Sequence, residues 1–396
     1  MPDLFYHRDV IIDALTRALT TSFAMGWMIL WPLILGFTIS GAIQAVVSKR
    51  QMSQLLPDDK PKTLALASLL GAASSSCSYA AVALARSLVK KGANFTAAMA
   101  FEIASTNLVI ELGIILAVLL GWQFTAAEFV GGPIMIIILA LLFRRFLTPK
   151  LLDAATRQAQ KGLAGKMEGH AGMGDMSVTG SKSVMQKLLS SQGRTATSHY
   201  FVMDWASVWT DIVLGLLIAG TVAAWVPMSF FQSFFITSDP VLSFIWGPLV
   251  GPLIAVVSFV CSVGNVPLAA VLWNGGISFG GLVSFIFADL IVYPILRIYK
   301  KYYGMKMAAF LFATFYLAMV AAGYLVEIIF WLLNLTPTVR AAIVPESGIT
   351  FNYTTVLNIF FLVIGAALVW RFLRTGGPAM LKMMDGKTSM QHKHDM

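Results

Sequence analysis

Charged residues are scarce in this chain of 396 residues: they make up 12% of it, whereas hydrophobic residues make up 58%. Soluble domains usually carry about 25% charged residues, so the composition argues against a soluble protein. Nine apolar stretches reach the roughly 20 residues that cross a bilayer: 21–47, 63–89, 94–121, 126–146, 206–227, 241–272, 277–297, 307–333 and 352–372. The sequence therefore predicts an all-α polytopic membrane protein.

Cysteine and histidine are also rare, with two and five residues. Two cysteines cannot make a disulfide framework. The serine in "GISFG" (276–280) lacks the base that a nucleophile needs, because all five histidines lie outside the apolar stretches: His7, His170, His199, His392 and His394. The chain also lacks an H-E-x-x-H motif, a P-loop and a dinucleotide fingerprint. These absences argue against an enzyme, and no cofactor is expected.

Basic residues give the chain a net charge of +9. No basic stretch is interleaved with aromatic residues, so nucleic acid is not an expected partner. In a membrane protein, Lys and Arg concentrate in cytoplasmic loops. Residues 1–19 mix acidic and basic side chains and contain no signal-peptide pattern, so the first apolar stretch is expected to remain as a span of the cell (inner) membrane.

Two similar halves are separated by a polar stretch. At an offset of 184 residues, eleven positions of a 31-residue window are identical, among them Cys77 with Cys261 and Gly92 with Gly276. Transporter folds are often built from such repeats. The expected parts are a first membrane repeat (1–146), a Met- and His-containing linker (147–200), a second repeat (201–334), a C-terminal span (335–374) and a tail (375–396).

The distribution of basic residues predicts the topology. If 63–89 and 241–272 are re-entrant hairpins, 25 of the 28 Lys and Arg lie on one side, as the positive-inside rule requires. Each repeat then has three spans and one hairpin, and the second repeat is inverted. The N-terminus lies outside, and the 147–200 loop and the C-terminus are cytoplasmic. The alternative is that both stretches are ordinary helices kinked by serine or proline.

The hairpin tips would coincide with polar interruptions around the two cysteines. Non-helical backbone at membrane depth must be buried by protein or reached by water, and half-helix N-termini there attract substrate groups. Thiols favour soft metals and metalloids, although a cysteine can also be a small buried hydrophobe. The candidate substrate-binding residues are Ser75, Ser76, Cys77, Ser78, Cys261, Ser262, Asn265, Ser105 and Asn107.

Acidic residues inside spans are functional candidates, because charge is costly there. Asp289 is the repeat counterpart of Ser105, and Glu102 precedes the polar patch that Ser105 begins. Both are candidate proton-coupling groups. The alternatives are a hydrogen bond between helices for Asp289, and a place near the membrane edge for Glu102 and for Glu111.

The linker contains "KMEGHAGMGDM" (166–176), which spaces thioether and imidazole groups three residues apart. Such groups suit Cu(I) or Ag(I). The candidate metal ligands are Met167, His170, Met173 and Met176. Alternatively, these methionines reflect a chain that contains 20 of them.

The second cysteine is followed by a pattern P-L-A-x-x-L-x-x-G-G, formed by Pro267, Leu268, Ala269, Leu272, Gly275 and Gly276. A weaker copy runs from Cys77 to Gly92, with Ala83 in place of the proline. This duplicated element resembles the predicted permease family that includes the organoarsenical efflux permeases. The resemblance implies secondary efflux of a soft, thiol-seeking solute, such as a trivalent organoarsenical, across the bilayer.

Three function classes follow: a permease for a metal(loid) or organometal(loid), a permease for another small solute such as an anion, and a non-transporting membrane protein that handles metal through the linker. The sequence leaves the oligomeric state open.

Overall fold

The computed structural model describes residues 2–46, 55–76, 78–90, 92–160, 184–258, 262–344 and 353–379, and no strand occurs among them. The first half contains α1 (Pro2–Val46), α3 (Pro61–Ser74), α4 (Ser78–Lys90), α5 (Phe95–Asn107), α6 (Ile110–Leu119) and α7 (Trp122–Phe146). Next come α8 (Pro149–Gln160), α10 (Val184–Leu189), α11 (Ser191–Trp225) and α12 (Met228–Phe234). The remainder is α13 (Pro240–Ser258), α14 (Ser262–Gly275), α15 (Phe279–Ile286), the 3₁₀ helix η2 (Phe287–Ile291), α16 (Tyr293–Tyr303), α17 (Met305–Leu332) and α18 (Tyr353–Arg374).

Several of these helices are long and apolar enough to cross a membrane, as the composition predicts. By length and hydropathy five qualify alone within the described residues, and up to eight if each of three bent pairs forms one span. The five are Ala14–Val46, Trp122–Phe146, Pro240–Ser258, Met305–Leu332 and Tyr353–Arg374. The chain is therefore a multi-pass membrane protein.

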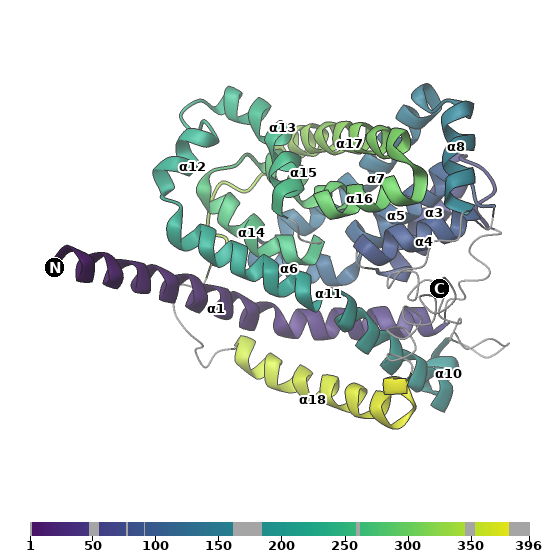
Figure 1. Ribbon diagram of the computed structural model, residues 1–396, viewed down its shortest axis with the longest axis horizontal. Coiled ribbons are helices and arrows are strands. Elements are labelled where there is room, and N and C mark those ends of the chain that lie inside the picture. Colours follow the sequence, from purple (N-terminus) through teal and green to yellow (C-terminus); the bar gives the residue numbers. More distant parts are fainter. Residues whose placement is uncertain are drawn as a thin grey trace, which may run out of the picture.

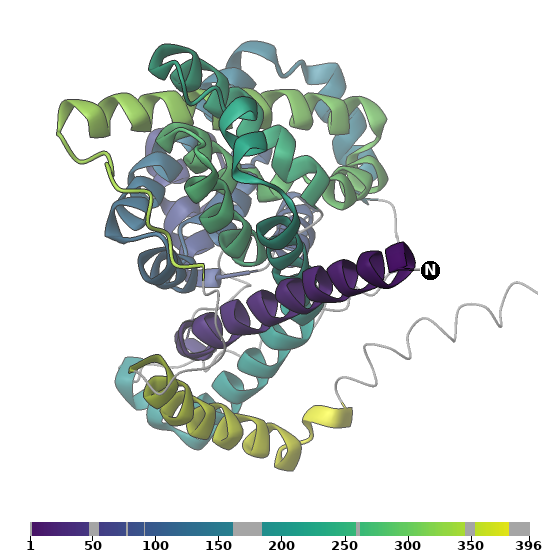
Figure 2. The same ribbon diagram turned by 90° about the vertical axis from the view of Figure 1, so that its left-hand side faces the viewer.

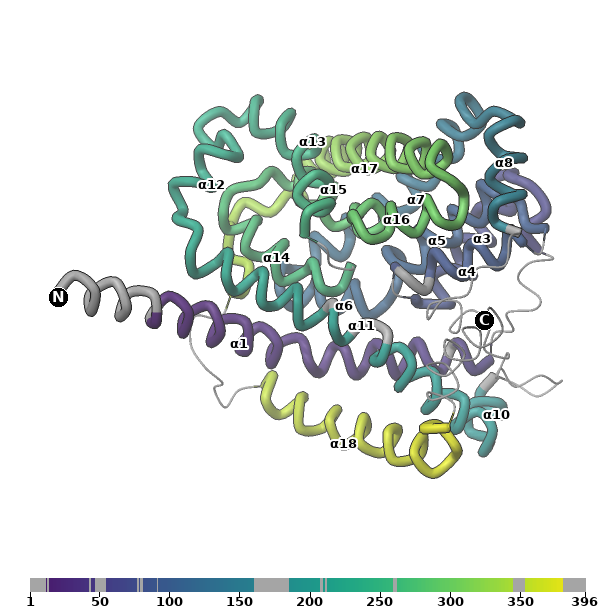
Figure 3. The backbone as a smooth tube through the Cα atoms, viewed as in Figure 1, coloured from purple at the N-terminus to yellow at the C-terminus, as the bar shows by residue number. Residues whose placement is uncertain are grey.

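The helices form a main body with three long helices along one side (Figures 1 and 2). There α1 packs against α11 along much of its length, and α18 covers both. The tube in Figure 3 shows α11 leaving the main body and crossing α1 toward α10. The remaining helices, from α3 to α8 and from α12 to α17, make up the main body.

The two halves contain matching breaks and turns. Gly92 and Gly276, 184 residues apart, both have positive φ angles (93° and 111°), which glycine adopts without steric cost. Two residues later, Asn94 and Ser278 cap α5 and α15 with their side chains. The bend between α5 and α6 is 41°, and the bend between the α15–η2 segment and α16 is 42°. The same succession of helices therefore occurs in both halves.

These bends correct the sequence-based view of 94–121 and 277–297 as continuous stretches. In the first, α5 ends at Asn107 and α6 begins at Ile110. In the second, Pro294 lies in the first turn of α16, where its missing N–H costs nothing. Within 147–200, the described residues contain α8, α10 and the start of α11.

In each of the short helix pairs, α3 with α4 and α13 with α14, the chain enters and leaves at the same end of the pair. The backbone N–H of Asn94, just after α4, donates to the carbonyl of Leu56, just before α3, at 2.8 Å. In the second half, a Cβ on Gly276, just after α14, would lie 2.5 Å from Thr237, just before α13. The outer ends of α3 and α4 therefore meet, as do those of α13 and α14.

Phenylalanine contacts locate the ends of α7 and α17. Phe95, the first residue of α5, contacts Phe143 near the end of α7, with ring centroids 6.0 Å apart. Phe279, the first residue of α15, contacts Phe330 near the end of α17 at 5.1 Å. Phe279 also lies 5.0 Å from Phe124, near the start of α7. Thus α5 begins beside one end of α7, and α15 begins beside the other.

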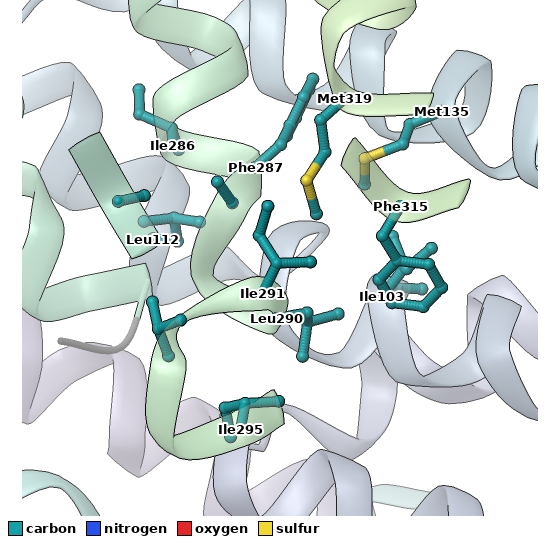
Figure 4. Close-up of a cluster of buried hydrophobic side chains, with 14 of the residues drawn as sticks. Ile103, Leu112, Met135, Ile286, Phe287, Leu290, Ile291, Ile295, Phe315 and Met319 are labelled. Carbon is teal, nitrogen blue, oxygen red and sulfur yellow. The ribbon is translucent and has the colours of Figure 1, made fainter. Parts of the chain in front are cut away.

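The 3₁₀ helix η2 lies in a hydrophobic cluster formed by both halves (Figure 4). Its Phe287, Leu290 and Ile291 are fully buried. Around them lie Ile103 of α5, Leu112 of α6, Met135 of α7, and Phe315 and Met319 of α17. Tight packing of this kind fixes the position of Asp289, the polar residue of η2.

The segment 335–344, which follows α17, crosses the end of α14. Asn274 and Ala342 exchange two hydrogen bonds of 2.9 and 3.0 Å. Arg340 donates to the carbonyls of Trp273 and Ile277 at 2.8 Å each, and its guanidinium stacks on the Trp273 ring at 4.5 Å. A further bond of 2.8 Å joins Ile343 N to the carbonyl of Leu119, at the end of α6.

Candidate functional site

The chain between α3 and α4 is non-helical and rich in serine. Ser75 has φ 35° and ψ 86°, a left-handed conformation that ends α3, and its N–H donates to the Gly71 carbonyl. The hydroxyls of Ser74 and Ser76 lie 3.0 Å apart. The N–H of Ser76 donates to the Ser105 carbonyl at 2.8 Å. These bonds satisfy backbone groups that the missing helical turn leaves open.

Helix α4 begins at Ser78, which joins the two halves of the chain. Its hydroxyl donates to Asp289 Oδ2 at 2.6 Å, and both residues are fully buried. Hydrogen bonds to a carboxylate are short and strong. Asp289, expected from the sequence as a coupling group, is thereby held at the N-terminus of a helix from the first half of the chain.

The end of α5 completes this cluster. Ser105, Thr106 and Asn107 are buried where α5 stops and the chain bends. The side chains of Thr106 and Asn107 lie beside the Asp289 carboxyl group. Neither amide atom of Asn107 completes a hydrogen bond with a described residue. The structure thus gathers Ser76, Ser78, Ser105, Asn107 and Asp289, five of the residues that sequence reasoning selected.

Glu102 lies one turn before this patch on α5 and is fully buried. The Tyr299 hydroxyl, from α16, donates to Glu102 Oε1. Glu102 Oε2 has no partner among the described residues. The Glu102 and Asp289 carboxyl groups are close enough for their charges to interact. Tyr299 was not among the expected site residues, because a tyrosine in "YPILRIYKKYY" carries no signal of its own.

The second interruption has its own polar contacts. Ser258, at the end of α13, donates to Asn265 Oδ1 at 3.0 Å, and Ser262 and Asn265 are both buried on α14. Helix α14 packs against η2 and α6, and so this second set of polar residues lies on a helix adjoining the element that carries Asp289. Cys77 and Cys261 fall outside the described residues, and Met167, His170, Met173 and Met176 do as well.

Ser75 belongs to a different polar chain, along α1 and α11. Its hydroxyl donates to Glu111 Oε1, and Glu111 is buried at the start of α6. Ser40 of α1 donates to Asp204 of α11 at 3.1 Å and lies 3.4 Å from the Ser75 carbonyl. Sequence reasoning did not find Ser40 or Asp204.

Two further buried acids were also missed. Glu128 of α7 is 1% exposed, and its carboxyl group interacts with that of Asp289. Glu327 of α17 accepts from the Ser278 hydroxyl at 3.4 Å, at the start of α15. Both lie in apolar stretches, so the rule that charge inside a span marks a functional candidate would have found them.

Arg86 and Arg144 anchor neighbouring segments of the main body to each other. Arg86 of α4 is buried, and it donates to the carbonyl of Ala159 at 2.9 Å and stacks on Tyr302 at 4.4 Å.

Just before α3, a hydrogen bond from Thr63 lowers the pKa of Asp58 below its usual value. Asp59 pairs with Arg144 of α7 at 2.7 Å, which anchors the start of α3 to the end of α7.

The described residues contain no group of three or more His, Cys, Asp or Glu side chains arranged to hold a metal ion. The arrangement is instead a set of hydroxyls, one amide and paired carboxyls at interruptions of helices. Such a site can exchange protons and bind a small solute.

Comparison with known proteins agrees with this geometry. The ArsP_1 family, described as "Predicted permease", matches residues 14–328. A protein of Mycobacterium tuberculosis (strain ATCC 25618 / H37Rv) named "Putative permease Rv2963" is 61% identical over 349 residues, which cover 88% of this chain and 86% of that protein. No solved structure matches. The chain therefore belongs to this family of predicted permeases, and this membership indicates a membrane transporter.

Proposed function

We propose that this permease is a secondary active transporter that exports a soft metal(loid) or organometal(loid) species. The observation that carries the proposal is the bond between Ser78 and Asp289. It joins an interrupted helix of one half to a buried carboxyl group of the other, at the position where both halves can act on one bound solute.

Alternating access between two inverted halves is the proposed mechanism. Corresponding helices α5 and α15 start beside opposite ends of α7, which supports inversion. The meeting of Leu56 with Asn94, and of Thr237 with Gly276, supports two re-entrant hairpins. In this arrangement the N-terminus lies outside, and the linker and the C-terminus are cytoplasmic.

Soft cargo is inferred from the two cysteines at these interruptions, whose flanking residues Ser76, Ser78 and Ser262 are buried or half-buried. Thiols bind trivalent arsenicals and soft metals in preference to hard ions. An anion is a poorer fit, because the Asp289 carboxyl group occupies the N-terminus of α4, where an anion would bind. The Met- and His-containing linker is proposed to deliver metal, and deletion of 166–176 tests that role separately.

The test is transport into everted membrane vesicles. The solutes are methylarsenite, arsenite, Ag(I) and a panel of organic anions, each with and without a pH gradient. Cys77→Ser and Cys261→Ser are expected to abolish transport of the trivalent arsenical. Serine 68 provides a matched control, because Ser68→Ala alters a half-buried hydroxyl of α3 away from the interruption. Movement of an organic anion alone, or full activity of both cysteine variants, would overturn the proposal.

Orientation has a separate test. Single cysteines introduced at Lys60 and Lys90, in a background without the native cysteines, are expected to react with an impermeant thiol reagent from the same side of the membrane. Reaction from opposite sides would show that α3 and α4 cross the membrane as one span.

A further inference from the structure

Glu128 is a buried carboxyl group to which the transport cycle proposed above gives no role. It lies on α7, and its Oε1 has no hydrogen-bond partner among the described residues. Leaving a buried carboxyl oxygen unpaired is costly. Gly131 lies one turn after Glu128 on the same face of α7 and packs against the Phe287 ring of η2. The Glu128 and Asp289 charges are close enough to interact, which links Glu128 to the candidate site.

Three carboxyl groups from three elements form a series: Glu102 on α5, Asp289 on η2 and Glu128 on α7. Glu102 and Glu128 each interact with Asp289. All three are at most 1% exposed. Each carries one oxygen without a partner among the described residues: Glu102 Oε2, Asp289 Oδ1 and Glu128 Oε1.

The series extends along the direction of α7. At a rise of 1.5 Å per residue, Glu102 lies about 10 Å from the start of α5, and Glu128 lies about 9 Å from the start of α7. Those two starts are at opposite ends of α7, because Phe95 contacts Phe143. The two glutamates therefore approach Asp289 from opposite ends of the bundle.

Asp289 is surrounded by polar side chains at the centre of this series. The buried Asn107 side chain lies beside its carboxyl group, and the Ser78 hydroxyl donates to Oδ2. The other groups that face the series are the hydroxyls of Thr106, Tyr299 and Tyr303. Arg86 interacts with Tyr303, while its side chain binds the Ala159 carbonyl.

The polar side chains beside Asp289 and Glu102 carry hydroxyl groups and one amide, from Ser78, Tyr299, Thr106 and Asn107. Three ionised carboxylates at such depth would repel one another and lack bulk water, and so the series must hold protons. A metal ion would need three ligands at one point, and the described carboxyls do not converge in that way. A proton, in contrast, needs only one donor and one acceptor at a time, which fits carboxyl groups that interact in pairs.

We propose that Glu128, Asp289 and Glu102 form a proton relay that connects the two ends of the transporter and drives the proposed transport. A proton on Glu128 passes to ionised Asp289 through a bridging water, which releases one proton as it accepts another, and this leaves Glu128 ionised and Asp289 neutral. Asp289 then transfers its proton to ionised Glu102 in the same way, with the Tyr299 hydroxyl holding the acceptor in place. Each step moves one proton and leaves the total charge of the series unchanged.

Because this relay rests on the proposed function, its test separates coupling from solute movement. Purified protein in proteoliposomes is assayed with methylarsenite in two ways: accumulation driven by a pH gradient, and exchange at equal pH. Glu128→Gln is expected to reduce accumulation by at least about tenfold, as loss of a proton-transfer group does, with exchange kept within about twofold. Asp153→Asn is the control, since it changes an exposed carboxyl group of α8 outside the series and should leave both rates unchanged.

Wild-type-like accumulation by Glu128→Gln would overturn the relay. If Glu128→Gln loses both exchange and accumulation while it still elutes as a folded species, the relay is also overturned, because Glu128 would then bind the solute. If wild-type protein moves methylarsenite in neither assay, the proposed function fails.

A second measurement tests the relay without any solute. Infrared difference spectra between acidic and basic pH are expected to contain protonated carboxyl bands in wild-type protein. Glu128→Gln should remove one band and narrow the pH range over which the others titrate, because coupled groups titrate together. Unchanged bands and an unchanged range would overturn the relay.

Discussion

Replacing Gly71 with alanine should disturb the candidate site through the packing of α3 on α5. A Cβ at this position would lie 2.3 Å from the carbonyl oxygen of Phe101, about 1 Å or more inside ordinary contact. The atom that it meets belongs to helix backbone, which cannot rotate away. Relief requires α3 to move outward by about that distance.

The change in the free energy of unfolding caused by Gly71→Ala is the sum of two opposing effects. Overpacking costs about 1–3 kcal/mol, and the upper end applies to a clash with backbone. Alanine recovers about 1 kcal/mol through its higher helix propensity. We therefore expect Gly71→Ala to destabilise the protein by about 2 kcal/mol. Transport should fall further, because a 1 Å displacement of α3 lengthens the bond from Ser76 to Ser105.

The assays are denaturant unfolding of purified protein in detergent micelles and vesicle transport. Gly251→Ala should destabilise the protein to a similar degree as Gly71→Ala, because its Cβ would lie 2.3 Å from the carbonyl oxygen of Gly281. Gly365→Ala on α18 is the matched control, since its nearest neighbour would be 3.5 Å away, and it should be neutral or stabilising. Equal stability of Gly71→Ala and Gly365→Ala would refute the argument.

Other positions test the matching features of the two halves. Asn94→Ala and Ser278→Ala should each destabilise the protein by about 1 kcal/mol through loss of an N-cap, and the double variant should lose the sum; a neutral result in unfolding would contradict the capping bonds. Gly276→Ala should destabilise more than Gly92→Ala, because its Cβ would meet a threonine at 2.5 Å whereas that of Gly92 meets nothing within 4 Å. Arg340→Gln should cost about 1–3 kcal/mol, because charged hydrogen bonds are lost, and unchanged thermal unfolding would rule this out.

Local sequence features predicted much of the organisation. Charge scarcity indicated membrane helices. The identity of Gly92 and Gly276 indicated a repeat, and the structure shows why both are glycine: each has a positive φ angle, which restricts the residue type whatever surrounds it. Serine clusters marked the interruption between α3 and α4 because hydroxyls can satisfy open backbone groups. Asp289 was found because a charge inside an apolar stretch is conspicuous.

The pairings across the molecule could not be predicted. Ser78 and Asp289 are 211 residues apart, and nothing in either segment specifies the other. Tyr299 looked like part of an ordinary basic helix end, although its hydroxyl reaches Glu102. The bend after Asn107 escaped notice because the surrounding residues are apolar without proline. In each case the decisive information is the packing of helices that come from different halves.

The hydrogen bonds of the 335–344 segment affect how much free energy is needed to separate the two halves of the transporter at this end. Toward the second half it has four hydrogen bonds, from Asn274, Ala342 and Arg340, together with stacking on Trp273. Toward the first half it has the bond from Ile343 to Leu119. A hydrogen bond contributes about 1 kcal/mol net, so separation at Leu119 shifts the equilibrium about fivefold, whereas release from α14 costs several times more free energy. The segment should therefore travel with α14 as one rigid body, and the bond at Leu119 should act as a weak latch whose strength sets how often this end of the transporter opens.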